Sequence, residues 1–220
     1  MIAKQRLYLN AAERSRFLNV ARKAEGPQRT LALTLLFTGC RLSEALELTT
    51  DAIQPEARVI AVRCLKKRRG EIVIREIPVP ADLIRELEQV HAISRRRDAA
   101  ERLWSLSRTS GWALIKEMMA AAGIHGKQAC PKGLRHAYGV HAIRCGIQLH
   151  LLQKWMGHAS MATTAVYANI LGPCTPVSGP CTHSWQAEGP CTPTSWGRVR
   201  LFRGRVRAPG KRRGRVRRHP

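Results

Sequence analysis

The sequence of 220 residues contains 38 lysine and arginine residues against 15 acidic residues, which gives a formal net charge of +23. This length accommodates one domain of ordinary size with an appendage, but not comfortably two domains. Residues 171–220 hold 11 basic residues and one acidic residue, so they carry +10 and residues 1–170 carry the remaining +13. A body this basic predicts a polyanionic partner, usually nucleic acid.

The sequence also argues against membrane and secreted proteins. The longest apolar run, residues 31–37, is too short to span a bilayer, and the polar stretch at residues 3–6 predicts that there is no signal peptide. The seven cysteines are an odd number, are scattered, and form no C-x-x-C pair, which disfavours a disulfide scaffold. We therefore expect a soluble cytoplasmic protein with reduced thiols.

The predicted elements of residues 1–170 are mostly helices. Asn10 followed by Glu13 is typical of an N-cap with its capping-box partner, and predicts a helix to about Ala24. A nearly apolar stretch follows at residues 30–37 and suits a buried helix that ends at Gly39. Shorter or more amphipathic helices are expected at residues 42–48, 82–91, 110–122, 134–145, 148–156 and 162–167.

Between residues 58 and 80 the apolar period changes to two, which predicts two strands. The first is framed by Val59, Ala61 and Cys64, and the second by Ile72, Ile74 and Ile77. A basic turn at residues 66–70 connects them, so the pair is expected to be a hairpin. The fold class predicted from these elements is mainly α with a small antiparallel β-sheet (α+β).

Four segments that carry reactive or cationic side chains follow one another along this body. They are TGCRLSEAL at 38–46, the lysine-bearing hairpin turn, PKGLRHAYG at 131–139, and LQKWMGH at 152–158 with TTAVYA at 163–168. Each fragment alone is a weak signal, but all four in this order over roughly 160 residues form a specific pattern. With these segments the chain resembles the catalytic domain of the tyrosine recombinases, the phage integrase family, and its fold is expected to be theirs.

The chemistry of metal-free phosphodiester cleavage explains why such residues would be needed. It requires a nucleophile, cations on the non-bridging oxygens and an acid for the leaving oxygen. Arginine suits the oxygens because its planar fork donates two hydrogen bonds and stays charged. The resemblance implies that Arg41 and Arg135 bind the phosphate, and that Tyr167 attacks phosphorus to form a 3′-phosphotyrosyl link.

The resemblance also implies roles for three further positions. Lys66, or Lys67 beside it, would protonate the leaving 5′ oxygen, and the sequence leaves open which of the two does so. His158 would donate a hydrogen bond to the phosphate. Lys132 stands where many family members have histidine, and lysine is a known alternative there. It can donate to the phosphate but is a poorer base for the tyrosine at neutral pH unless its pKa is depressed, which the crowding of Arg41, Arg135 and Lys66 would do. No ATP, metal ion or organic cofactor is implied.

Each of these residues has an ordinary structural interpretation when taken alone. Arg41 could pair with Glu44 at a helix start, and we expect Glu44 to brace the Arg41 region. Tyr138 is expected in the core, His136 could belong to the polar face of a helix, and Tyr167 could simply pack. The joint pattern therefore carries the interpretation, rather than any single residue.

One domain followed by a tail is expected. Residues 1–170 would be the catalytic domain, beginning at about residue 7, so that the N-terminal domain with which family members clamp DNA is expected to be absent. Residues 171–220 would be a basic, disordered tail. In the tail, Gly-Pro-Cys-Thr begins at positions 172, 179 and 189, and Gly-Arg-Val-Arg begins at 197, 204 and 214.

The two tail motifs recur with the same steps of 7 and 10 residues, which suggests one DNA repeat translated in two reading frames. Back-translation supports this interpretation, with a repeat unit of 25 codons less one base, that is 74 nucleotides. Such a tail would have replaced the original C-terminus by a frameshift or an insertion. The alternative is a native disordered tail that touches DNA.

The resulting hypothesis is a site-specific DNA recombinase or integrase that cleaves and rejoins double-stranded DNA and associates with itself on DNA. Because the tail offers little apolar periodicity after Tyr167, we expect this tyrosine to be poorly held and recombination to be weak. The alternative hypothesis is a DNA-binding protein or integrase remnant without catalytic activity.

Overall fold

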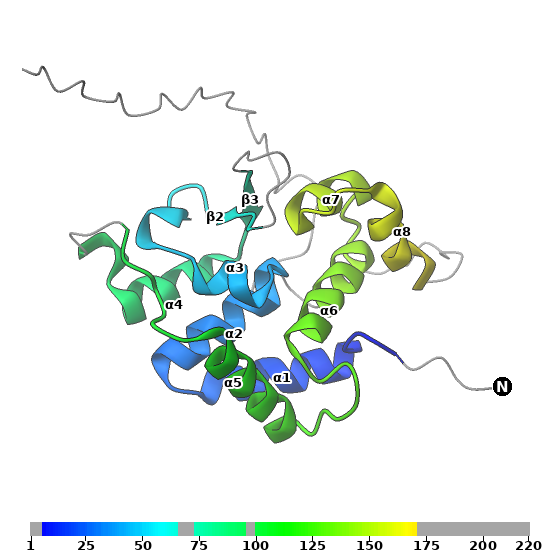
Figure 1. Ribbon diagram of the computed structural model, residues 1–220, viewed down its shortest axis with the longest axis horizontal. Coiled ribbons are helices and arrows are strands. Elements are labelled where there is room, and N and C mark those ends of the chain that lie inside the picture. Colours follow the sequence, from blue (N-terminus) through cyan, green and yellow to red (C-terminus); the bar gives the residue numbers. More distant parts are fainter. Residues whose placement is uncertain (1–5, 66–72, 96–99, 171–220) are drawn as a thin grey trace, which may run out of the picture.

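The computed structural model describes residues 6–65, 73–95 and 100–170. Eight α-helices lie within these residues, with a three-stranded sheet inserted after the third (Figure 1). The helices are α1 (Ala11–Lys23), α2 (Gly26–Thr38), α3 (Leu42–Leu46), α4 (Ala81–His91), α5 (Arg108–Ala121), α6 (Pro131–Arg144), α7 (Leu149–Met156) and α8 (Met161–Ile170). The strands are β1 (Ile53–Gln54), β2 (Val59–Arg63) and β3 (Ile74–Pro78), and short 3-10 turns occur at Thr50–Ala52 and Ile93–Arg95.

The fold class predicted from the sequence is confirmed, and local signals set several helix ends. The backbone N–H of Glu13 donates to the Asn10 side chain, and the Glu13 carboxylate accepts from the Asn10 N–H, so the capping box opens α1 as expected. Two helices begin earlier than predicted because a proline stands in their first turn: Pro27 in α2 and Pro131 in α6. Proline is favoured there, since the first-turn N–H groups have no helical partner.

The strands confirm the predicted pair and show which of its faces is buried. The sheet has the order β1-β2-β3 with antiparallel pairing, and Ile60 lies opposite Ile77. Ile60 and Val62 form the buried face of β2, whereas Val59 and Ala61, which framed the predicted strand, are half-buried, and Cys64 lies just after its end. Ile74 is 60% exposed, because Ile77 faces inward and strand side chains alternate. The hairpin turn at 66–70 lies outside the described residues.

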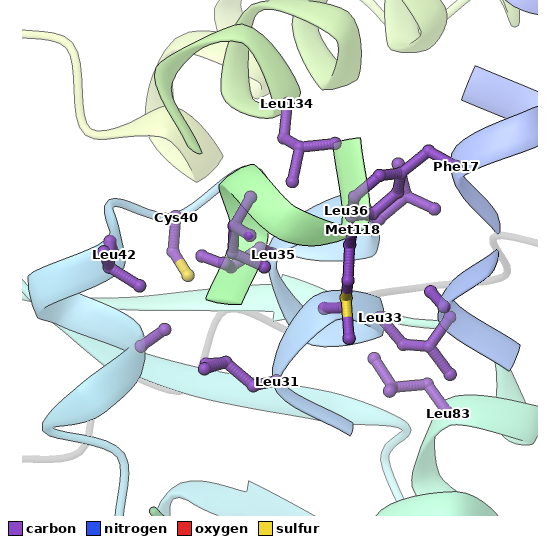
Figure 2. Close-up of a cluster of buried hydrophobic side chains, with 14 of the residues drawn as sticks. Phe17, Leu31, Leu33, Leu35, Leu36, Cys40, Leu42, Leu83, Met118 and Leu134 are labelled. Atoms are coloured by element: carbon purple, nitrogen blue, oxygen red, sulfur yellow. The ribbon is translucent and has the colours of Figure 1, made fainter. Parts of the chain in front are cut away.

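Helix α2 is the centre of the core. It packs against α1, α3, α4 and α6, and most of its side chains are buried, which agrees with its nearly uninterrupted apolar sequence. Figure 2 shows Leu31, Leu33, Leu35 and Leu36 of this helix among side chains from α1, α4, α5 and α6.

A second, smaller apolar cluster lies where α6, α7 and α8 meet. It contains Tyr138, Leu152, Met156 and Tyr167, all almost fully buried. Figure 1 shows α7 and α8 side by side next to α6, and α7 also contacts β3. The two clusters thereby join the C-terminal helices to the rest of the domain. Within the residues that the structure describes, no helix is both long and apolar enough to cross a membrane.

Candidate active site

Arg41 stands at the start of α3 and is braced by a carboxylate of the same helix. Its backbone N–H and its Nη1 donate to the two oxygens of Glu44, at 2.9 and 2.7 Å. Glu44 is buried, whereas the Arg41 side chain keeps 43% of its surface exposed. The predicted bracing role of Glu44 is therefore confirmed. The ion pair still leaves the Arg41 guanidinium accessible to a ligand.

A second arginine, Arg75 on β3, also binds Glu44. Its Nη2 lies 2.6 Å from Glu44 Oε2, and the exposed fractions of the two side chains are only 4% and 1%. Its Nη1 donates to the carbonyl oxygen of Trp155 in α7, at 3.2 Å. Burial raises the pKa of Glu44, but the Arg75 charge and the Arg41 hydrogen bonds outweigh it and hold the pKa below its usual value.

Sequence reasoning missed Arg75, although a signal was present. In β3, Arg75 is in phase with the inward-facing Ile77, two residues later, and a cation on the buried side of a strand requires a partner. Arg75 also explains why a glycine stands at position 157, where α7 ends in a left-handed conformation (φ +63°). A Cβ atom on Gly157 would lie 2.6 Å from Arg75 Nη1, so only glycine fits.

Arg135 in α6 is buried, and two backbone carbonyls hold its guanidinium. Nη1 donates to the carbonyl of Gly39 at 2.7 Å, and Nη2 donates to the carbonyl of Met156. Gly39 adopts φ +60° and lies against the Tyr138 ring, which would clash with any side chain at this position. Burial, and then the charge of Arg41, lower the pKa of Arg135 to about 10, so it remains a cation at neutral pH.

His158 follows Gly157 in the turn between α7 and α8. Its backbone N–H donates to the carbonyl of Gln153, and its own carbonyl accepts from the Gln153 side chain, at 3.1 and 3.2 Å. Its Nδ1 lies 3.0 Å from the hydroxyl of the buried Thr164. Burial and the charges of Arg135 and Arg41 lower the pKa of His158 to about 4, so the imidazole is neutral at pH 7.

Tyr167 lies on α8 between two histidine rings. Its hydroxyl is 3.0 Å from Nδ1 of His136, and its ring stacks on that of His158 with 6.1 Å between centroids. Burial raises the pKa of Tyr167, and the Arg135 charge opposes this only in part. The side chain is 2% exposed and packs on Gly139, whose Cβ would lie 2.7 Å from the ring. It is thus firmly held, in contrast to the expectation of a loose tyrosine.

Of the predicted site residues, Arg41, Arg135, His158 and Tyr167 are brought together. Arg135 donates to the carbonyl of Gly39, two residues before Arg41, and to that of Met156, two residues before His158, whose ring stacks on Tyr167. Tyr138 is completely buried, as expected.

The predicted lysines have different outcomes. Lys66 and Lys67 lie outside the described residues, so the structure does not distinguish between them. Lys132 is exposed in the first turn of α6, and its charge lowers the pKa of His136 one turn further along. His136 itself is half-buried rather than a solvated residue of a helix face, and it is the second residue of the site that sequence reasoning missed. The contact between His136 and Tyr167 joins α6 to α8 across 31 residues, so no local sequence pattern identifies His136 as a site residue.

The arrangement has the chemistry of a phosphate site next to a nucleophile. Two guanidinium groups and a neutral imidazole can donate hydrogen bonds to phosphate oxygens, and a phenol lies against that imidazole. The phenol is protonated at neutral pH, so an attack by its oxygen requires a base.

Comparison with known proteins agrees with this geometry. Residues 7–171 match the model of the phage integrase family. The tyrosine recombinase XerA of Pyrococcus furiosus is 30% identical over 171 residues, which cover 74% of this chain and 57% of the relative. The tyrosine recombinase XerD of Corynebacterium glutamicum is 30% identical over 160 residues, covering 69% of this chain and 51% of that protein. The chain thus spans just over half the length of these two relatives.

Solved structures show the same fold at lower identity. The XerH site-specific recombinase bound to its difH substrate superposes with a TM-score of 0.64 and 24% identity, covering 76% of this chain and 52% of that one. The XerA recombinase superposes with a TM-score of 0.62 and 23% identity, covering 76% and 60%. The Tn1549 transposon integrase in complex with transposon right end DNA superposes with a TM-score of 0.57 and 20% identity, covering 76% of this chain and 63% of that one.

Proposed function

This chain belongs to the phage integrase family, and from that premise we propose that it cleaves and rejoins double-stranded DNA through a covalent bond to Tyr167. The observation that carries the proposal is the buried phenol of Tyr167, which stacks on His158 and feels the charge of Arg135, while the charge of Arg41 acts on both of these residues. The relatives are named tyrosine recombinases, and two of the three similar structures described above contain DNA. Site-specific recombination or integration is the activity that these similarities favour.

In the proposed reaction, Arg41 and Arg135 bind the non-bridging oxygens of the scissile phosphate. Arg135 is held from behind by two carbonyls and Arg41 by Glu44, so both cations are oriented before DNA binds. Fixed donors of this kind stabilise the charge that develops on phosphorus without reorganisation at the moment of reaction.

His158 supplies a third donor. We assign the Thr164 hydroxyl as the donor to Nδ1, which places the ring proton on Nε2, from which it is donated to a phosphate oxygen. The lowered pKa of His158 means that it acts as a neutral donor. Lys132 donates a hydrogen bond to the phosphate. Lys66 or Lys67 protonates the 5′ oxygen as it leaves.

The +13 charge of residues 1–170 supports DNA as the substrate, because phosphate contacts by lysine and arginine dominate protein–DNA affinity. Self-association on DNA and location at the nucleoid belong to the same proposal. Among the described residues nothing favours the alternative of an inactive remnant, since Arg41, Arg135, His158 and Tyr167 are all in place.

A trapping experiment tests the proposal without a known target. The full chain is incubated with a pool of nicked suicide duplexes of randomised sequence, in which cleavage releases a short fragment and prevents rejoining. We expect a DNA adduct that survives denaturation and vanishes in Tyr167→Phe but persists in Tyr8→Phe, the matched control. An adduct that remains in Tyr167→Phe would contradict the proposal.

A further inference from the structure

The contact between Tyr167 and His136 leads to a further assignment. We propose that His136 is the general base that takes the proton from the Tyr167 hydroxyl as this oxygen attacks phosphorus. The assignment rests on the proposed function, and it adds a catalytic residue that the motif pattern did not indicate.

Geometry is the first support. His136 Nδ1 lies 3.0 Å from the Tyr167 hydroxyl oxygen, which is within the reach required of a general base. The two rings are tilted by 55° with centroids 5.9 Å apart, so the nitrogen approaches the phenol oxygen and not the ring face. Gly139, one turn after His136 on α6, gives the phenol room to reach this position.

The electrostatic surroundings are the second support. The groups that face His136 are Lys132 and Arg135 on its own helix, Tyr167 on α8, and His158 in the turn before α8. Burial, Lys132 and Arg135 lower the pKa of His136 below its usual value, so its ring is neutral at pH 7 and has one nitrogen free to accept. We assign the ring proton to Nε2, which leaves Nδ1 as the acceptor.

The third support is the position of Lys132, the residue that stands in the place of the more usual histidine. It is exposed at the start of α6, and an ammonium group carries no lone pair with which to accept a proton. A base is nevertheless needed, because the buried phenol remains protonated at neutral pH. His136 is within hydrogen-bond distance of the phenol oxygen.

The step balances as follows. The Tyr167 Oη–P bond forms while the P–O5′ bond breaks, the phenol proton moves to His136 Nδ1, and the 5′ oxygen takes a proton from the hairpin lysine. During rejoining the 5′ hydroxyl attacks the phosphotyrosine and returns its proton to the hairpin lysine, while the imidazolium of His136 returns its proton to the departing phenolate.

The decisive experiment compares single-turnover adduct formation by the full chain, by His136→Gln and by His150→Gln. The substrate is a duplex selected from the suicide pool with the wild-type chain. His150 is exposed on α7 and serves as the matched control. Glutamine can still hydrogen-bond to the phenol but cannot take its proton, so we expect His136→Gln to react about 10²–10⁴-fold more slowly. His150→Gln should react at the wild-type rate.

The pH profile and the leaving group separate a base from a merely structural residue. The wild-type rate should rise with pH through a pKa below 6.5 and then level off. Lys132→Gln should move this rise to higher pH, because it removes a charge that depresses the pKa of His136. On a duplex with a bridging sulfur at the 5′ position, whose thiolate leaves without a proton, the His136→Gln defect should persist.

The outcomes distinguish the two proposals. If wild type forms the adduct and folded His136→Gln, judged by its circular dichroism and melting temperature, reacts within a few-fold of it, the base assignment is overturned while the proposed function stands. Recovery of His136→Gln on the sulfur-containing duplex would also overturn the assignment, because it would indicate a role at the leaving group. If no chain forms an adduct on any duplex of the pool, the proposed function fails, and the base assignment fails with it.

Discussion

Removal of Arg75 should destabilise the domain more than removal of any exposed arginine. The Arg75–Glu44 pair is buried, with 4% and 1% of the side chains exposed, and its N–O distance is 2.6 Å. Breaking a buried pair by removing one partner typically costs about 3–5 kcal/mol, because the remaining charge is left without compensation. Arg41 retains its own bond to Glu44, which keeps the expected loss for Arg75→Met near the lower end, about 3 kcal/mol.

The assay is equilibrium unfolding in urea, with the slope of the transition compared between variants. A loss of about 3 kcal/mol corresponds to a fall in melting temperature of roughly 6–12 °C for a domain of this size. Arg85→Met is the matched control: its pair with Asp82 is exposed, so it should change the free energy of unfolding by less than about 0.5 kcal/mol.

A double variant identifies the cause. Adding Glu44→Gln to Arg75→Met removes the stranded charge, so the double variant should recover at least about 1 kcal/mol of what Arg75→Met lost. The reasoning would be refuted if Arg75→Met unfolded within 1 kcal/mol of wild type, or if Glu44→Gln added its own full loss to that of Arg75→Met.

Three further predictions concern the site. Because the pKa of His158 is lowered from 6.5 to about 4, the folded state resists its protonation; its stabilising contribution should be complete above pH 6.5 and fall as the pH drops toward 4. An NMR titration in which His158 is half-protonated near pH 6.5 would contradict this. Gly139→Ala places a Cβ atom 2.7 Å from the Tyr167 ring and should lose about 1–3 kcal/mol of stability together with most adduct formation, whereas Gly123→Ala, in open space, should retain the adduct. DNA affinity measured by fluorescence anisotropy should fall at least tenfold between 50 and 200 mM salt, and an affinity independent of salt would argue against phosphate contacts.

Local signals predicted most of the fold. The Asn10–Glu13 capping box, the apolar run of α2 and the period of two before Pro78 each depend on neighbours in sequence, and the structure contains the corresponding elements. The two-residue strand β1 was missed because so short a segment has no period of its own. The buried faces of β2 and β3 could not be predicted, because apolar side chains occur on both sides of these strands and composition alone does not identify the inner one.

The site residues, too, were predictable only where a pattern along the sequence carried them. Arg41, Arg135, His158 and Tyr167 lie in segments with a recognisable order, and the structure places them together. The roles of Arg75 and His136 depend on contacts with residues 31 positions away in each case, Glu44 and Tyr167. Such contacts are fixed by how β3, α3, α6 and α8 pack, and no spacing along the chain encodes them.

The most direct test of the central claim is the identity of the residue that becomes linked to DNA. After trapping on the suicide pool, digestion with trypsin releases the peptide from Trp155 to Arg198, which contains Tyr167 as its one tyrosine. Mass spectrometry should find a nucleotide joined through a 3′ phosphate to Tyr167 in this peptide. A covalent nucleotide on any other residue, with Tyr167 unmodified, would contradict the assignment of Tyr167 as the nucleophile.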